Sequence, residues 1–167
     1  MEPRYLESLF QKYKSRGVVI DANLLLLYFV GSHDPGLISR YKRTRVYSED
    51  DYYLLKELID YFDRIITTPN ILTEVSNLSG QLGEPIRQPY FDTFKQKVSI
   101  LDETYCAATE ACRCTHFNRV GLTDAVIMQI SEGQYLVITD DFPLAGILGS
   151  MNMDVINFNH LRRLKWG

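Results

Sequence analysis

The sequence predicts an α/β fold, a three-layer α/β/α sandwich around a central, mostly parallel sheet. Short runs of apolar and β-branched residues are separated by longer segments in which apolar residues recur at helical spacing. The short runs are apolar throughout rather than alternating, which is typical of parallel strands covered by helices on both faces. Hydrophobic residues make up 46% of the 167 positions and charged residues 23%. The chain can therefore bury a core, and we expect one domain over residues 1–167.

Each predicted element has a local signal in apolar spacing, capping residues or turn residues. In the first half, the elements are a helix over 3–15, the strand Val18–Ile20, a helix over the apolar stretch Leu24–Val30, a basic and partly mobile connection over 31–47, a helix that begins at the capping pair Ser48 and Asp51, and the strand Ile65–Thr67. In the second half, they are the helix Asn70–Ser79, two helices within 81–120, the helix Leu122–Ser131, the strand Tyr135–Ile138, a short helix Phe142–Leu148 and the strand Val155–Phe158.

Composition and patterning exclude several classes of protein. The longest apolar run, Leu24–Val30, has seven residues, whereas a membrane-spanning helix needs about 20. The first residues show no secretory signal pattern, so we expect a cytoplasmic protein. Three cysteines cannot form a disulfide framework, so we expect reduced thiols. The net charge of -3 excludes a generally basic nucleic-acid coat but leaves local basic patches open.

Acidic residues directly follow two of the predicted strands. Asp21 comes after Val18–Ile20, and Asp140 and Asp141 come after the strand that ends near Ile138. In a parallel sheet, ligands bind beyond the carboxyl ends of the strands. If the two strands are neighbours, their carboxylates are expected to converge there.

Two further acids, Glu74 and Asp124, lie where a helix should be apolar. Glu74 falls within the inward stripe that contains Ile71 and Leu78, and Asp124 shares a face with Ile127. A surface carboxylate would not be placed at either position. Both acids are therefore candidates for the same site.

A group of four or five carboxylates in partly dry surroundings would be stabilised by a divalent cation, because like charges otherwise drive some of them to protonate. Oxygen ligands without clustered His or Cys favour Mg²⁺ or Mn²⁺ over Zn²⁺. Taken singly, Asp21 and Asp141 could equally be helix N-caps. Glu74 and Asp124 lie inside their helices, so the whole set favours a metal site.

Four segments of the chain resemble, in order, the acidic motifs of the PIN domain family of metal-dependent nucleases. They are VVIDANLLLLYFVG, TPNILTEVSNLSG, GLTDAVIMQIS and LVITDDFPLAGIL, and they span most of the chain. The resemblance implies a PIN-like sandwich in which catalytic and metal-binding roles fall to Asp21, Glu74, Asp124 and Asp141. It implies supporting roles for Asn23, Thr139 and Asp140. Thr139 sets the register on Asp141, while Asp140 beside it leaves the identity of the fourth ligand open.

By this resemblance, the protein would be a Mg²⁺- or Mn²⁺-dependent endoribonuclease that hydrolyses RNA phosphodiesters with metal-bound water and leaves a 5′-phosphate and a 3′-hydroxyl. The family also implies the toxin role of a toxin–antitoxin pair, an antitoxin-like protein inhibitor and a homodimer. One alternative is a non-catalytic PIN-like domain that binds RNA or a protein partner. A phosphate-accepting receiver domain is less favoured, because the strand Ile65–Thr67 ends without an acceptor aspartate.

Two basic groups are candidate contacts to RNA phosphates. The first comprises Arg40, Lys42, Arg43 and Arg45, and the second Arg162, Arg163 and Lys165. Either could equally be a solvated surface. Tyr41 and Tyr47 could stack on bases. Cys112, Cys114 and His116 are spaced too tightly for a usual zinc site, so idle thiols are favoured.

Overall fold

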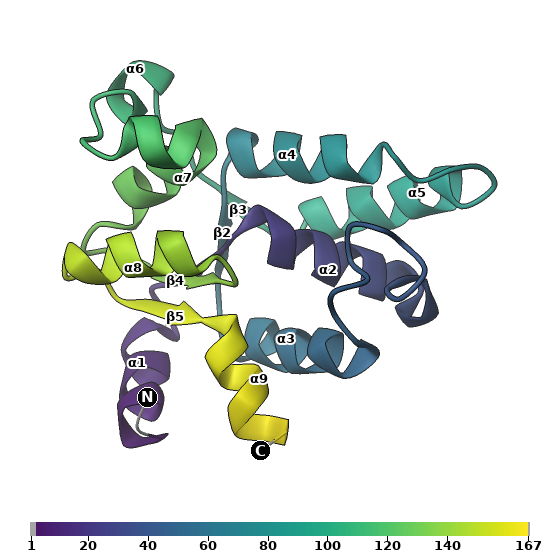
Figure 1. The fold of residues 1–167 in the computed structure, drawn as a ribbon, viewed down its shortest axis with the longest axis horizontal. Coiled ribbons are helices and arrows are strands. Elements are labelled where there is room, and N and C mark those ends of the chain that lie inside the picture. Colours follow the sequence, from purple (N-terminus) through teal and green to yellow (C-terminus); the bar gives the residue numbers. More distant parts are fainter. Residues whose placement is uncertain (1–2, 167) are drawn as a thin grey trace.

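The computed structural model describes residues 3–166, along which helices and strands alternate (Figure 1). The strands are β1 (Val18–Ile20), β2 (Ile65–Thr67), β3 (Asp102–Glu103), β4 (Leu136–Thr139) and β5 (Val155–Asn157). The α-helices are α1 (Pro3–Tyr13), α2 (Ala22–His33), α3 (Glu49–Tyr61), α4 (Pro69–Ser79), α5 (Arg87–Val98), α6 (Ala108–Ala111), α7 (Phe117–Ser131), α8 (Phe142–Ser150) and α9 (Phe158–Trp166). A 3-10 helix, η1 (Pro35–Leu37), follows α2.

The strands of the described residues form one sheet in the order β3-β2-β1-β4-β5, and every neighbouring pair is parallel. Helices pack around this sheet (Figure 1), so the predicted α/β sandwich is confirmed. The central strand β1 pairs Val18 with Ile65 of β2 on one side and with Leu136 of β4 on the other. The carboxyl ends of β1 and β4 therefore lie side by side.

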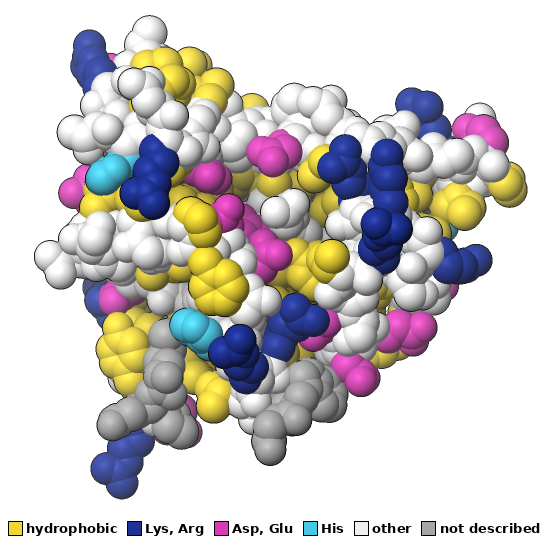
Figure 2. All heavy atoms as spheres, viewed as in Figure 1, with side chains coloured by type: hydrophobic (Ala, Val, Ile, Leu, Met, Phe, Trp, Pro, Cys, Tyr) yellow, Lys and Arg dark blue, Asp and Glu magenta, His cyan; other side chains and the backbone are white. Residues whose placement is uncertain are grey.

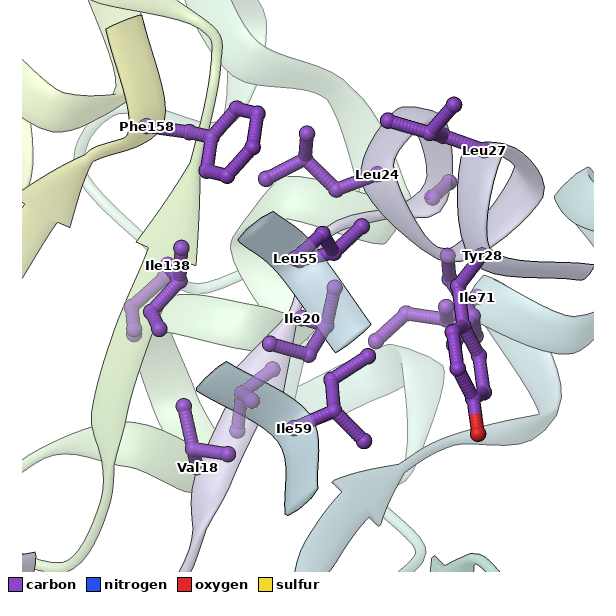
Figure 3. Close-up of a cluster of buried hydrophobic side chains, with 14 of the residues drawn as sticks. Val18, Ile20, Leu24, Leu27, Tyr28, Leu55, Ile59, Ile71, Ile138 and Phe158 are labelled. Carbon is purple, nitrogen blue, oxygen red and sulfur yellow. The ribbon is translucent and has the colours of Figure 1, made fainter. Parts of the chain in front are cut away.

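The core is built on β1, whose three residues are fully buried. Figure 3 shows a cluster of buried side chains to which α2 contributes Leu24 and Leu27, α3 contributes Leu55 and α4 contributes Ile71. Helix α2 has buried residues all round, which explains its unbroken apolar sequence. This packing fixes the start of α2, and with it the residue that links α2 to β1.

The predicted partly mobile connection over 31–47 is folded instead. Helix α2 extends to His33, and Asp34 then caps η1 by accepting a hydrogen bond from the Gly36 N–H at 2.9 Å. The side chain of Leu37 in η1 is buried, as are those of Ile38, Tyr41, Thr44 and Tyr47 in the turns that follow. Because Tyr41 and Tyr47 are buried in the protein, the predicted stacking of their rings on bases is wrong.

Between residues 81 and 120 the prediction of two helices holds only in part. Helix α5 is of ordinary length, but α6 has four residues. The two-residue strand β3 lies between them and is both charged and exposed, so no apolar pattern marks it. In α7, Gly121 has a φ of +81° and interrupts the helix. A regular helix restarts at Leu122, where the sequence predicted its beginning.

The two remaining sequence predictions concern membranes and thiols. Among the described residues, no helix has the length and apolar character to cross a membrane. The thiols of Cys106, Cys112 and Cys114 are free, as predicted.

Candidate active site

Asp21 is the residue at which β1 ends and α2 begins. Its backbone N–H donates to the carbonyl of Ile138 at 3.2 Å, and its Oδ1 accepts the capping hydrogen bond of α2 from the Leu24 N–H at 2.9 Å. Its Oδ2 accepts from the Thr139 hydroxyl and from the Asp140 N–H, the latter at 3.1 Å. Three donors therefore hold this carboxylate, which is only 5% exposed, in one orientation.

Asp141 has the corresponding position between β4 and α8. Its Oδ1 accepts from the Leu144 N–H at 2.8 Å and caps α8, while its own N–H donates to the Thr139 hydroxyl at 3.0 Å. The residue is exposed, and the cap does not use Oδ2. Capping and cation binding are thus compatible at Asp141, because each requires only one of its oxygens.

Asp140 is held by two residues whose contacts with it the sequence did not predict. The Tyr47 hydroxyl donates to its Oδ2, and the side-chain amide of Asn159 donates to its backbone carbonyl at 2.9 Å. Its Oδ1 is buried without a hydrogen-bond partner among the described residues. Asn159 follows β5 closely, and its polar side chain at that position was an available signal. Tyr47 is 93 residues from Asp140, and no local pattern connects them.

The two helical acids, Glu74 and Asp124, are both half-buried. Glu74 lies in the second turn of α4, and Asp124 lies in the first turn after the break at Gly121. Glu74 and Thr123, the neighbour of Asp124, line one hollow of about 460 Å³ between α4 and α7. The field at a helix N-terminus favours a negative charge, so the restart at Leu122 suits the carboxylate of Asp124.

The charges of the acids act on one another. Burial raises the pKa of Asp21 to about 7, and the charge of Asp140 adds to the rise. Burial also raises the pKa of Asp124 to about 6, with further contributions from the charges of Asp141 and then Glu74. The acids thus form two interacting groups, Asp21 with Asp140 and Asp124 with Asp141 and Glu74. Adjacent residues on one loop, Asp140 and Asp141, join the two groups.

Figure 2 shows one face of the molecule from outside. Acidic side chains occupy the middle of this face of the molecule, and Lys and Arg side chains lie on several sides of them. The viewpoint is that of Figure 1, in which the first turn of α2 lies in the same central area. A negative centre with basic surroundings could accept both a cation and a polyanion.

The donor set fits a hard divalent cation, but the side chains are not arranged to chelate one. All candidate ligands are carboxylates, and the buried, unpartnered Oδ1 of Asp140 adds an oxygen without a hydrogen-bond donor. Among the residues described, however, no three Asp, Glu, His or Cys side chains form a group that could hold a metal ion. A cation site here would require these carboxylates to lie closer together than they do in this structure.

The other predicted site residues lie at the surface. Asn23 is exposed in the first turn of α2, beside Asp21. Arg40 is paired with Asp34 at 2.9 Å, and Arg43 donates to the Gln81 side chain at 3.1 Å. Lys42 and Arg45 are exposed, and their side chains make no ion pair or hydrogen bond within the described chain. These two are the cations of the first basic group that are free to meet a phosphate.

Neither a protein-family model nor a curated protein sequence matches this chain. The functional assignment therefore rests on the fold and on the geometry and charge of the site.

Proposed function

We propose that this protein is a Mg²⁺- or Mn²⁺-dependent ribonuclease of the PIN domain type. The observation that carries the proposal is the mutual influence of acids from separate segments. Burial raises the pKa of both Asp124 and Asp21; the charges of Asp141 and Glu74 add to the rise at Asp124, and the charge of Asp140 adds to it at Asp21. Carboxyl groups whose pKa values are raised by burial and by neighbouring acids are concentrated at functional sites of proteins.

In this proposal Asp21, Glu74, Asp124 and Asp141 would hold the cation. When bound, the cation would lower the pKa of water and offset the charge that develops on the phosphoryl oxygens. Its positive charge would also relieve the repulsion that now raises the pKa of Asp124 and Asp21.

The side chains of the protein would position the reactants. Asp21 is fixed by its three donors and provides a rigid anchor. Asp141 is exposed, and its Oδ2 can accept a hydrogen bond from the attacking water. Lys42 and Arg45 would attract the phosphates of the RNA chain.

Cleavage of an unstructured RNA, with Mn²⁺ and with a chelator, tests this proposal. Asp21→Asn and Asp124→Asn should each reduce cleavage by about two orders of magnitude or more, because each removes an anionic ligand from the cation. Asparagine keeps the oxygen that caps α2, so the Asp21 variant should fold, but with lower stability, because its amide NH2 cannot accept from the Asp140 N–H as Oδ2 does. Asp92→Asn is the matched control, since Asp92 is an exposed carboxylate on α5 whose contact is a surface ion pair with Lys95.

A result in which both active-site variants cleave like the wild type would refute the assignment. Chelator-resistant cleavage would refute the metal dependence. Circular dichroism and thermal melting of the variants exclude unfolding as the cause of lost activity.

A second candidate is a non-catalytic PIN-like domain that binds RNA. The observation that favours it is that no three acids of the described chain are arranged to hold a metal ion. Tight RNA binding that needs no divalent cation, without turnover in Mg²⁺ or Mn²⁺, would favour this candidate over the ribonuclease.

A further inference from the structure

A second hollow, of about 700 Å³, lies next to the strand-end acids. Its walls come from the beginning of α3, the first residue of α8 and the polar face of α9. The lining residues that matter here are Ser48, Asp50, Phe142, Asn159, Arg162 and Arg163. This volume is within the usual range for pockets that bind small ligands.

Phe142 gives the hollow an exposed aromatic surface directly beside the carboxylates. It follows Asp141 in the chain, and its side chain is 54% exposed although it is a large apolar group. The ring of His160 meets it edge to face, with the centroids 6.0 Å apart. Single-stranded nucleic acids bind by stacking bases on aromatic rings of this kind.

The two arginines of the hollow have different roles. Arg162 is immobilised, because its Nε and Nη2 each donate to the buried carboxylate of Asp51 at 2.8 Å. Arg163 is exposed and has no ion pair within the described chain. Arg162 therefore forms a rigid wall, while Arg163 is free to contact a phosphate. Asp50 is exposed on the α3 side and can accept from an amino group on a base edge.

Hydrogen bonds connect the lining of the hollow to the acids. Asn159 lines it and donates to the carbonyl of Asp140 at 2.9 Å, while its Oδ1 accepts from Arg162 at 3.3 Å. The guanidinium of Arg162 also lies 5.8 Å from the ring centroid of Tyr47, whose hydroxyl donates to Asp140. A nucleotide bound here would thus be held at a fixed position relative to Asp140 and Asp141.

We propose that this hollow binds one nucleotide of a single-stranded RNA, with its base stacked on Phe142 and an adjoining phosphate on Arg163. This inference rests on the proposed function for the identity of the ligand as RNA. Beyond that function, the inference names the surface site at which the RNA chain would be held beside the acids.

The test measures RNA binding and base stacking without requiring cleavage. A short unstructured RNA that carries 2-aminopurine is titrated with the full-length protein in the Asp124→Asn background, in a chelator. Base–aromatic stacking contributes about 1–3 kcal/mol, so Phe142→Ala should weaken binding roughly 5- to 160-fold and remove the quenching of the 2-aminopurine. Phe142→Trp should preserve both signals. Arg163→Ala should reduce the slope of log affinity against log salt by about 0.7.

Tyr105→Ala is the matched control. Its ring is 77% exposed and lines a different hollow, with residues from the end of α7. It should leave affinity and quenching unchanged. Because Phe142 is exposed, its removal should not affect the melting temperature, which is measured alongside.

The outcomes separate this inference from the proposed function. Metal-dependent cleavage together with unchanged binding and quenching in Phe142→Ala would overturn the nucleotide site and leave the ribonuclease intact. Binding that depends on Phe142, without any cleavage, would support the nucleotide site and contradict the proposed ribonuclease activity. A wild-type protein that binds no RNA would overturn both.

Discussion

The hydroxyl of Thr139 donates a hydrogen bond to Oδ2 of Asp21, 118 residues away in the chain. The same oxygen of Thr139 accepts from the backbone N–H of Asp141 at 3.0 Å. Thr139 is the last residue of β4, and Asp21 directly follows β1, the strand beside it. One hydroxyl therefore connects the two strand-end acids that cap α2 and α8.

Replacing Thr139 tests this connection. Thr139→Val should destabilise the protein by about 1–3 kcal/mol, because it removes a buried hydrogen bond to a carboxylate. It should also raise the pKa of Asp21 above its present value of about 7, since a donor to the charged form is lost. Urea denaturation and cleavage assays check both effects. Thr139→Ser keeps the hydroxyl and should retain most of the stability; equal losses in the two variants would contradict this role.

The stability of the protein should fall as pH rises from about 4 to 7. The folded-state pKa values of Asp21 and Asp124, about 7 and about 6, are raised from the ordinary value of 3.8. In this window the folded state binds more protons than the unfolded state, so the free energy of unfolding decreases with pH and levels off above pH 7. Denaturation at pH 4.5, 6 and 8 measures the slope.

Asp124→Asn should reduce that slope and stabilise the protein at pH 8 by about 1–2 kcal/mol, after allowance for solvent screening. In the wild type, Mn²⁺ should raise the stability at pH 8, because it binds the ionised acids. Asp92→Asn, on the surface of α5, should leave the slope unchanged. An identical slope in the wild type and Asp124→Asn would show that Asp124 titrates normally.

The free cations of the first basic group should determine the salt dependence of RNA binding. Lys42→Ala/Arg45→Ala should lower the slope of log affinity against log salt by about 1.4, or about 0.7 for each lost phosphate contact. Arg40→Ala is the control, because Arg40 is already paired with Asp34 and donates to the Gly36 carbonyl at 2.9 Å. Affinity titrations between 50 and 300 mM salt, roughly the range over which such slopes are resolved, provide the measurement. If the double variant keeps the wild-type slope, these residues do not meet the RNA.

Replacing either of two helical glycines by alanine should change the stability of the protein, in opposite directions at the two positions. A Cβ at Gly31 would lie 2.3 Å from the Tyr52 ring, so Gly31→Ala should cost about 1–3 kcal/mol through overpacking between α2 and α3. A Cβ at Gly146 would have nothing within 4 Å, and Gly146→Ala should gain about 0.5–1 kcal/mol from helix propensity. Thermal and urea denaturation compare the two. A Gly31→Ala protein as stable as the wild type would mean that α3 can move away from α2.

The parts of the fold that the sequence predicted are those with a dense local signal. β1 and β2 were predicted residue for residue, because their β-branched runs are buried on both faces. The capping box of Ser48 and Asp51 also forms as predicted. In contrast, β3 joins the sheet through backbone pairing of exposed acidic residues, a role that leaves no pattern in the sequence.

For the site, the sequence identified the acids and Thr139, which bonds to two of them, but not the support that Tyr47 and Asn159 give to Asp140. Asp21 and Asp141 come shortly after apolar runs that predict strands, so their positions could be predicted from the sequence. The contact of Tyr47 with Asp140 depends on how the turns after η1 bring Tyr47 to the loop that follows β4. Such a long-range contact leaves no periodic pattern in the sequence from which it could be predicted. The expectation that 31–47 is loosely structured was wrong for the same reason.

Asp21 has a structural position as well as a proposed chemical role, and this limits which substitutions can test either one. The residue starts α2, the most deeply buried helix next to the central strand, and it also carries one of the two most perturbed carboxyl groups in the described chain. A substitution that lacks a side-chain acceptor, such as alanine, would weaken folding and the proposed catalysis at once. Loss of activity in such a variant would say little about catalysis, and only shape-matched polar replacements separate the two effects.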